Sequence, residues 1–189
     1  MAPFELQTLI HQERWWQSAC AYGSNTDAGS PLEARWLHDS MVKIDPTARE
    51  EIRPLWALTR KGGLPMPKNL VAEMEERKLA GYRVSYCQRN GSLEFFESEI
   101  ETLAANATLP FCVGFGNEPE FQGKITPKEF DALLAKVMPV LFRLRDNFGV
   151  HISPPAMSSF RNILERGYGE VLAKWLAGQE KVVLRVHNY

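Results

Sequence analysis

Cys112 and His151 are the pair of residues in this sequence that could act as a thiol nucleophile and its base. The cysteine lies in a predicted strand beside a glycine turn, and the histidine lies near the end of another predicted strand. Phe111 and Val113 flank Cys112 with apolar side chains, and an apolar setting keeps a thiol protonated and unreactive. We therefore interpret Cys112 as a core cysteine and predict no catalytic residue.

Candidate metal ligands and acid–base pairs lack the necessary spacing. None of the four histidines forms an HxxxH or HxH pattern, and the three cysteines form no CxxC pair. An acidic run comprises Glu94, Glu97, Glu99 and Glu101. Two of these acids fall in the first turn of a predicted helix capped by Ser98, where the helix dipole favours negative charge. Gly114-Phe115-Gly116 lacks the third glycine of a dinucleotide-binding loop. We expect no metal and no cofactor.

Two stretches have the composition of a recognition surface. Trp15 and Trp16 lie about 100° apart on a predicted helix, so both rings cannot point to the centre of one core. The loop over residues 116–123 combines polar and acidic side chains with a single apolar one. Its binding candidates are Asn117, Glu118, Glu120 and Phe121. A broad core boundary for the tryptophans and plain solvation for the loop remain the alternatives.

The composition is that of an ordinary globular chain of 189 residues, which fits a single domain over residues 1–189. A net charge of −1 provides no field for binding nucleic acid. No apolar run approaches the ~18 residues of a membrane span, and the first five residues lack the basic start of a signal peptide. We therefore expect a cytoplasmic protein with reduced cysteines that binds neither nucleic acid nor membrane.

The strongest helix signal spans residues 126–149. Thr126-Pro127-Lys128-Glu129 forms a capping box with proline at the first helical position, apolar residues recur at helical spacing, and Gly149 ends the helix. Pro139 interrupts this pattern and predicts a kink or a split. Further helices are predicted over residues 3–22, 30–44, 45–62, 68–80, 98–107 and 158–177, the last broken near Gly167.

The predicted strands all follow residue 81, although Phe4-Glu5-Leu6 alternates like the start of a strand before the longer window favours a helix. Residues 82–88 and 93–96 are short aromatic-rich runs separated by Asn90-Gly91, the commonest tight hairpin dipeptide. Further strands are predicted over residues 109–115, 150–152 and 181–187. Because these elements do not alternate as βαβ units, we predict an α+β fold with a mostly antiparallel sheet of about four strands covered by helices. Residues 1–81 would form a helical portion, and residues 82–189 would contain the sheet.

Ile44-Asp45-Pro46 leads to Trp56 and is followed by the predicted hairpin, strand and long helix. Over the middle of the chain, this order of elements resembles the immunity proteins that bacteria encode beside polymorphic or type VI secreted toxins. The resemblance implies a non-catalytic inhibitor that binds and occludes a cognate toxin, so the expected partner is another protein. Two alternatives stay open. One is an adaptor or structural subunit of a phage or secretion assembly. The other is an enzyme or secreted toxin with a site built from scattered residues such as Cys112, Glu118, His151 and Arg161.

Overall fold

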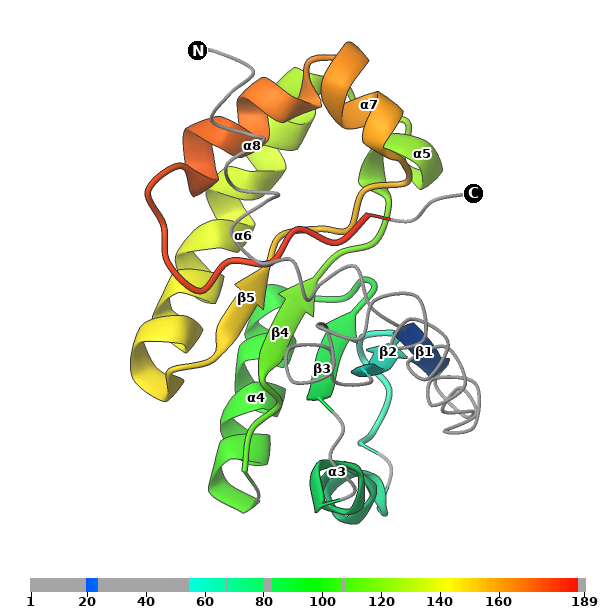
Figure 1. Ribbon diagram of the computed structural model, residues 1–189, viewed down its shortest axis with the longest axis vertical. Coiled ribbons are helices and arrows are strands. Elements are labelled where there is room, and N and C mark those ends of the chain that lie inside the picture. Colours follow the sequence, from blue (N-terminus) through cyan, green and yellow to red (C-terminus); the bar gives the residue numbers. More distant parts are fainter. Residues whose placement is uncertain (1–19, 24–54, 67, 80–82, 107, 187–189) are drawn as a thin grey trace, which may run out of the picture. The chain divides into compact units, whose positions relative to one another are not determined.

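The computed structural model describes residues 20–23, 55–66, 68–79, 83–106 and 108–186 (Figure 1). These residues belong to two compact units, and the chain passes from one to the other after Val113. The first unit contains β1 (Cys20–Gly23), β2 (Leu55–Arg60), α3 (Leu70–Leu79), β3 (Arg83–Gln88), α4 (Leu93–Asn106) and the start of β4 (Cys112–Phe115). The second contains the rest of β4, α5 (Pro119–Gln122), α6 (Pro127–Phe148), β5 (His151–Ser153), α7 (Phe160–Glu165) and α8 (Tyr168–Leu176).

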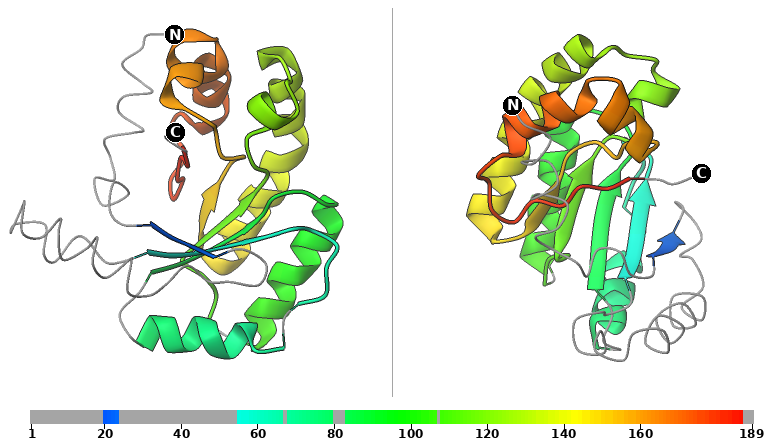
Figure 2. Two further views of the ribbon diagram at one scale, coloured as in Figure 1. Left: turned by 90° about the vertical axis from the view of Figure 1, so that its right-hand side faces the viewer. Right: turned by 45° about the horizontal axis from the view of Figure 1, so that its top comes forward.

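The strands of the first unit are parallel, and the predicted antiparallel sheet is therefore wrong. β1 pairs with β2 and β2 pairs with β3 in the same direction, with Cys20 opposite Leu55 and Leu55 opposite Arg83. Figure 2 shows β2 and β3 as neighbouring arrows that point the same way. Parallel neighbours cannot be joined by a tight turn, because the chain must return to the starting edge of the sheet. Between β2 and β3 this return is made through α3.

The second unit continues the same pattern. Asn117, just after β4, forms a parallel bridge with Ala156, just after β5. The predicted C-terminal strand is present as two parallel bridges beside β5 and the residues that follow it, Ile152 with Val182 and Met157 with Val186. Within the first unit the order is β1-β2-β3, so neighbouring strands are also successive in the chain. The predictions of strands over 109–115 and 150–152 are confirmed by β4 and β5.

Two predicted N-terminal helices are wrong where the structure describes them. Residues 20–23 form β1 instead of the end of a helix over 3–22, and Leu55–Arg60 forms β2 instead of the end of a helix over 45–62. A short strand buried on both faces reads as a continuous apolar run, and periodicity cannot separate such a run from a buried helical turn. The predicted helical portion over 1–81 thus includes two strands, and the remainder of residues 1–54 lies outside the described residues.

The predicted hairpin over residues 82–96 is wrong in its second half. β3 is present, but Asn90-Gly91 leads into α4 and not into a second strand. Ser92 begins this helix, since its Oγ accepts a hydrogen bond from Phe95 N at 3.0 Å. Phe96, Ile100 and Leu103 then fall on one face of the helix and are fully buried. The helix start predicted at Ser98 is therefore also wrong.

The helix predicted over residues 126–149 is confirmed as α6. Thr126 and Glu129 form the expected capping box, Gly149 ends the helix in the left-handed conformation, and the helix continues through Pro139. Its apolar face packs against β5 and α8. The ring of Phe130 meets that of Tyr168 on α8 edge to face, with 5.6 Å between the ring centroids. This helix is the main core element of the second unit.

The helices predicted over residues 68–80 and 158–177 are confirmed, with slightly shorter bounds. α3 corresponds to the helix predicted over 68–80, and α7 and α8 correspond to the broken helix over 158–177, with Gly167 at the break. Among the helices that the structure describes, none combines the length and the apolar composition needed to cross a membrane.

Asp131→Asn tests the contact between α6 and α8. Hydrogen bonds from Lys174 and then Trp175 hold the pKa of Asp131 below its ordinary value. A carboxyl group with a depressed folded pKa stabilises the fold above its unfolded pKa, and this contribution is lost as the pH falls through the folded pKa. We expect D131N to lower the urea midpoint at pH 7 and to lose this effect toward about pH 2. Circular dichroism measures the midpoints, with D146N on the same helix as the control. An equal loss at both pH values would contradict the assignment.

Candidate functional site

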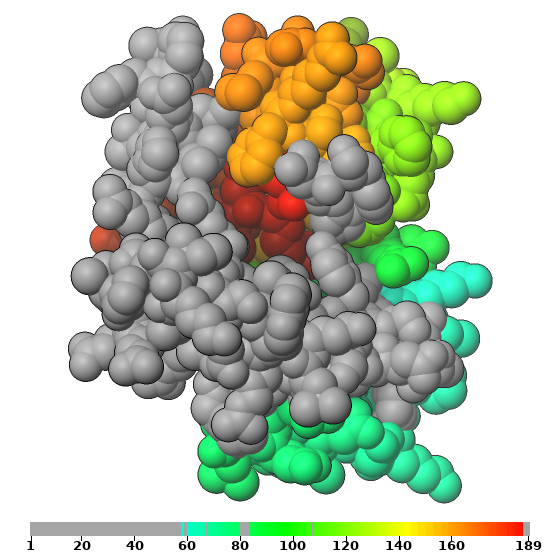
Figure 3. Space-filling view, turned by 45° about the vertical axis from the view of Figure 1, so that its right-hand side comes forward, coloured from blue at the N-terminus to red at the C-terminus, as the bar shows by residue number. Residues whose placement is uncertain are grey.

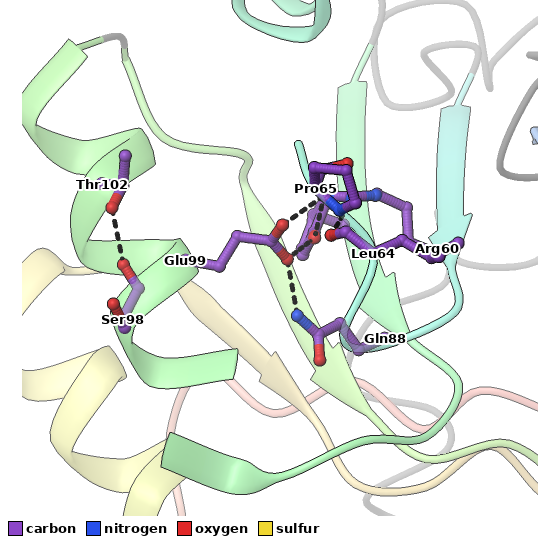
Figure 4. Close-up of polar contacts among 8 residues, drawn as sticks. Arg60, Leu64, Pro65, Gln88, Ser98, Glu99 and Thr102 are labelled. Carbon is purple, nitrogen blue, oxygen red and sulfur yellow. Dashed lines mark hydrogen bonds and ion pairs between the residues drawn. The ribbon is translucent and has the colours of Figure 1, made fainter. Parts of the chain in front are cut away.

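A buried ion pair joins the strands of the first unit to α4 (Figure 4). Arg60, at the carboxyl end of β2, donates from Nη1 to Glu99 Oε1, and both side chains are almost fully buried. Glu99 Oε2 accepts from the Tyr86 hydroxyl and, at 2.5 Å, from Gln88 Nε2. Tyr86 and Gln88 are two residues apart on β3 and so share one face of the sheet. The Glu99 carboxylate therefore neutralises the buried charge of Arg60 and accepts hydrogen bonds from Tyr86 and Gln88.

The same arginine fixes the loop that follows β2. Arg60 Nη2 donates to the carbonyl oxygens of Leu64 at 2.8 Å and Pro65 at 2.7 Å, as the fork of a guanidinium allows. Burial, and then the negative charge of Glu99, raises the pKa of Tyr86 far above its ordinary value, so its hydroxyl remains a donor. We interpret this cluster as support for the carboxyl ends of β2 and β3.

Asn117 and Glu118 come directly after the carboxyl end of β4 in the second unit. Glu118 is 2% exposed, and its φ of 47° and ψ of 50° lie in the left-handed region, which costs a non-glycine residue roughly 1–2 kcal/mol. Two backbone hydrogen bonds hold this segment to the residues after β5, Glu118 N to Ala156 O at 2.7 Å and Ala156 N to Gly116 O at 3.3 Å. Non-glycine residues held in such a conformation cluster at functional sites.

The Glu118 carboxylate is oriented from its own helix. Gln122 Nε2 donates to Glu118 Oε2 at 3.0 Å, four residues along the chain. Gln122 itself is exposed, whereas Glu118 is buried, so the amide links the buried carboxyl group to the surface. Gly116 has a φ of +88°, and a Cβ there would lie 2.9 Å from Pro155 Cβ, so the close contact of this loop with Pro155 requires glycine.

Glu120 is a second buried carboxylate in the same segment. Its Oε1 accepts from Ser158 N at 2.5 Å and from Asn162 Nδ2 at 3.4 Å, which ties α5 to the start of α7. Asn162 Nδ2 also donates to Ser158 Oγ at 2.8 Å. Burial, and then the charge of Glu120, raises the pKa of Tyr168 on α8. Glu118 and Glu120 are thus two buried carboxylates in one short segment with separate partners, Gln122 for Glu118, and Ser158 and Asn162 for Glu120.

The binding residues predicted from the loop have different environments. Phe121 is 64% exposed, as a recognition residue would be, but Glu118 and Glu120 are buried and not solvated. Their neighbours in space, Ser158 and Asn162, were missed because nothing in the sequence relates residue 120 to residue 158. Trp15 and Trp16 lie outside the described residues.

The residues of the predicted alternative enzyme site have different settings in the structure. Cys112 and His151 are the first residues of β4 and β5, at the amino ends of these strands, and Cys112 is buried. Arg161 forms an exposed pair with Glu165 at 2.7 Å. Only Glu118 of that set lies after the carboxyl end of a strand.

The acidic run was misread for a different reason. Glu99 lies in the interior of α4 and pairs with Arg60, so its position is not explained by the helix dipole. One signal could have revealed this pair. In a helix starting at Leu93, Glu99 falls on the same face as Phe96 and Leu103, where a carboxylate needs a buried partner.

The comparisons with known proteins return no family. No protein-family model matches the chain, and the search of curated proteins finds no match. Within the described ranges, no group of three or more histidine, cysteine, aspartate or glutamate side chains is arranged to hold a metal ion.

Glu99→Gln tests the buried cluster. The substitution keeps the shape of the side chain but leaves the Arg60 charge buried without its carboxylate, which costs about 3–5 kcal/mol. We expect the free energy of unfolding, measured by urea denaturation, to fall by that amount. The matched control is E165Q, which removes an exposed partner of Arg161 and is expected to change stability by less than about 0.5 kcal/mol. Equal effects of the two variants would refute the supporting role of the cluster.

Proposed function

We propose that this protein is an acid–base hydrolase of glycosidic bonds and that Glu118 is its proton donor. The observation that carries the proposal is the buried Glu118, held in a left-handed backbone conformation three residues after the carboxyl end of β4. The proposal replaces the enzyme site that the sequence suggested around Cys112 and His151. It retains one residue of that set.

The placement of Glu118 supports a catalytic role. In folds with successive parallel strands and connecting helices, active sites lie at the carboxyl ends of the strands and are built from the loops that follow them. Asn117 and Glu118 begin such a loop after β4, and Ala156 to Ser158 belong to the corresponding loop after β5. The loop that carries Glu118 is therefore bound to the neighbouring loop after β5 at this edge.

The chemistry available to such a site is carboxyl-group catalysis. Burial disfavours the ionised form of a carboxyl group, so a buried acid can hold a proton for a leaving group. In glycoside hydrolysis, that acid protonates the glycosidic oxygen while the bond from this oxygen to the anomeric carbon breaks. Water supplies the hydroxyl group of the new sugar end, and a second carboxylate on the other side of the ring acts as base or nucleophile. Glu120 is not proposed for this second role, because its Oε1 already binds Ser158 N.

A neighbouring aromatic ring favours a sugar over a small ionic substrate. Phe121 is 64% exposed and is three residues from Glu118. Ligand sites combine apolar and aromatic side chains with a few placed polar groups, and the C–H face of a sugar ring packs on an aromatic ring. The pairing of a buried acid with an exposed ring therefore fits a carbohydrate.

Glu118→Gln tests the proposal on aryl glycosides of increasing leaving-group quality. A general acid contributes about 10²–10⁴-fold to the rate, mainly where the leaving group is a poor one. We expect E118Q to lose at least about 100-fold in kcat on alkyl or phenyl glycosides. A much smaller loss is expected on dinitrophenyl glycosides, whose leaving groups depart without a proton. E165Q serves as the control with unchanged rates. The proposal fails if wild-type protein hydrolyses no glycoside of the panel, or if E118Q loses the same factor on every substrate.

We propose a protein-binding inhibitor, an immunity protein in the sense of the sequence resemblance, as the second candidate. The observation that favours it is the exposed apolar surface of α5 and α7, formed by Phe121, Phe160 and Leu164. Glu120 and Asn162 join these two helices, and Figure 3 shows them side by side at the surface. Exposed apolar clusters of this kind are typical of protein interfaces.

Leu164→Asp separates this second candidate from the first. Leu164 is 66% exposed, so its replacement by a charged residue spares the core but disrupts an apolar interface. If the chain inhibits a toxin encoded by a neighbouring gene, we expect L164D to weaken binding at least about tenfold by isothermal titration. Unchanged affinity, or no binding of wild-type protein to any neighbouring gene product, would exclude this candidate.

A further inference from the structure

Glu120 occupies an unusual position for a carboxylate. It is 9% exposed, and only one of its two oxygens is matched, since among the described residues Glu120 Oε2 is buried without a hydrogen-bond partner. Buried polar groups are nearly always hydrogen-bonded, so an unmatched carboxylate oxygen in a well-packed segment requires an explanation. A neutral residue would avoid this cost if the position served packing alone.

The other carboxylate oxygen of Glu120, Oε1, accepts a hydrogen bond from the loop after β5. Glu120 Oε1 lies 2.5 Å from Ser158 N, and an ionised acceptor binds a backbone N–H more strongly than a neutral one. Together with Glu118 N to Ala156 O and Ala156 N to Gly116 O, this bond is a third link between the loop after β4 and the loop after β5. The three hydrogen bonds are made at Gly116, Glu118 and Glu120, so they hold the backbone before, at and after Glu118.

The backbone conformation of Glu118 requires hydrogen bonds of this kind to hold it. Its left-handed conformation is unfavourable for a residue with a Cβ and persists only when the surrounding structure holds it. α5 is a single turn, and its N-cap residue, which is Glu118 itself, makes no side-chain capping hydrogen bond. The short helix therefore depends on contacts outside itself, and Glu120 supplies a carboxylate contact to Asn162 on α7 and to Ser158 before it.

We propose that Glu120 is a positioning residue that fixes the Glu118 carboxyl group for proton transfer, by tying α5 to Ser158 N and Asn162. This inference rests on the proposed function. Glu120 itself does not touch the substrate. Its effect reaches the reaction through the backbone of residues 118–120 and the orientation that this backbone gives to Glu118.

The kinetic test compares E120A, E120Q and E118Q on a phenyl glycoside. E120A removes the link to Ser158, and we expect kcat to fall about 10–100-fold while KM changes less than about threefold, because a displaced acid affects the transition state more than ground-state binding. E120Q keeps an oxygen acceptor for Ser158 N and is expected to recover most of the rate. A loss shared equally by kcat and KM, or no recovery in E120Q, would overturn the positioning role. Urea midpoints of the variants identify any that fail to fold.

A second measurement needs no substrate and separates the two proposals. In an amide ¹H–¹⁵N spectrum of the wild-type protein, we expect the Ser158 amide proton to lie downfield because of its charged acceptor. In E120Q this proton should move upfield, and the Glu118 amide should move with it, whereas both should be unchanged in E165Q. An unchanged Glu118 amide would overturn the positioning role even if Glu118 is catalytic. If no glycoside is hydrolysed, the proposed function fails, and the coupled movement of the two amides still decides whether Glu120 fixes Glu118.

Discussion

The common direction of the strands is the constraint on which the rest of this structure depends. When strands run parallel, their carboxyl ends lie along one edge, and every connection must cross back over the sheet before the next strand begins. In the first unit this places Arg60 and Gln88 at the ends of neighbouring strands. In the second unit it places Asn117 beside Ala156. Polar residues that are far apart in the chain become neighbours for this reason alone.

Both units use buried carboxylates, but they use them differently. Glu99 accepts hydrogen bonds from donors on two strands. Its partner Arg60 also donates from Nη2 to a carbonyl oxygen of the loop after β2. That arrangement fixes a loop and leaves little freedom for chemistry. Glu118 accepts a hydrogen bond from the Gln122 amide, and Glu120 accepts from Ser158 N, while the other carboxylate oxygen of Glu120 is unmatched within the described part of the chain. A buried carboxylate oxygen without a hydrogen-bond partner lowers stability, and such unfavourable groups are common at functional sites.

The two proposed functions draw on one short segment. The hydrolase uses the buried carboxyl group of Glu118 together with the exposed ring of Phe121, and the inhibitor uses that ring together with the exposed apolar side chains of α7. A single helical turn can present both, because successive side chains of α5 point in different directions around its axis. The segment is the part of the described chain in which a strained backbone, buried acids and an exposed aromatic ring come together.

The sequence by itself determined the elements whose signals are local. The capping box at Thr126 and the glycine at position 149 specify α6, and the turn residues around Gly167 specify the break between α7 and α8, because caps and turns depend on neighbouring residues only. It also indicated the loop that contains Glu118. The tertiary structure decided the rest. Leu55–Arg60 is a strand because it pairs with β1 and β3, and Leu93–Asn106 is a helix with one apolar face buried. The partners of Glu99 and Glu120 are likewise set by strand order, since a charge becomes buried and matched only when distant segments meet.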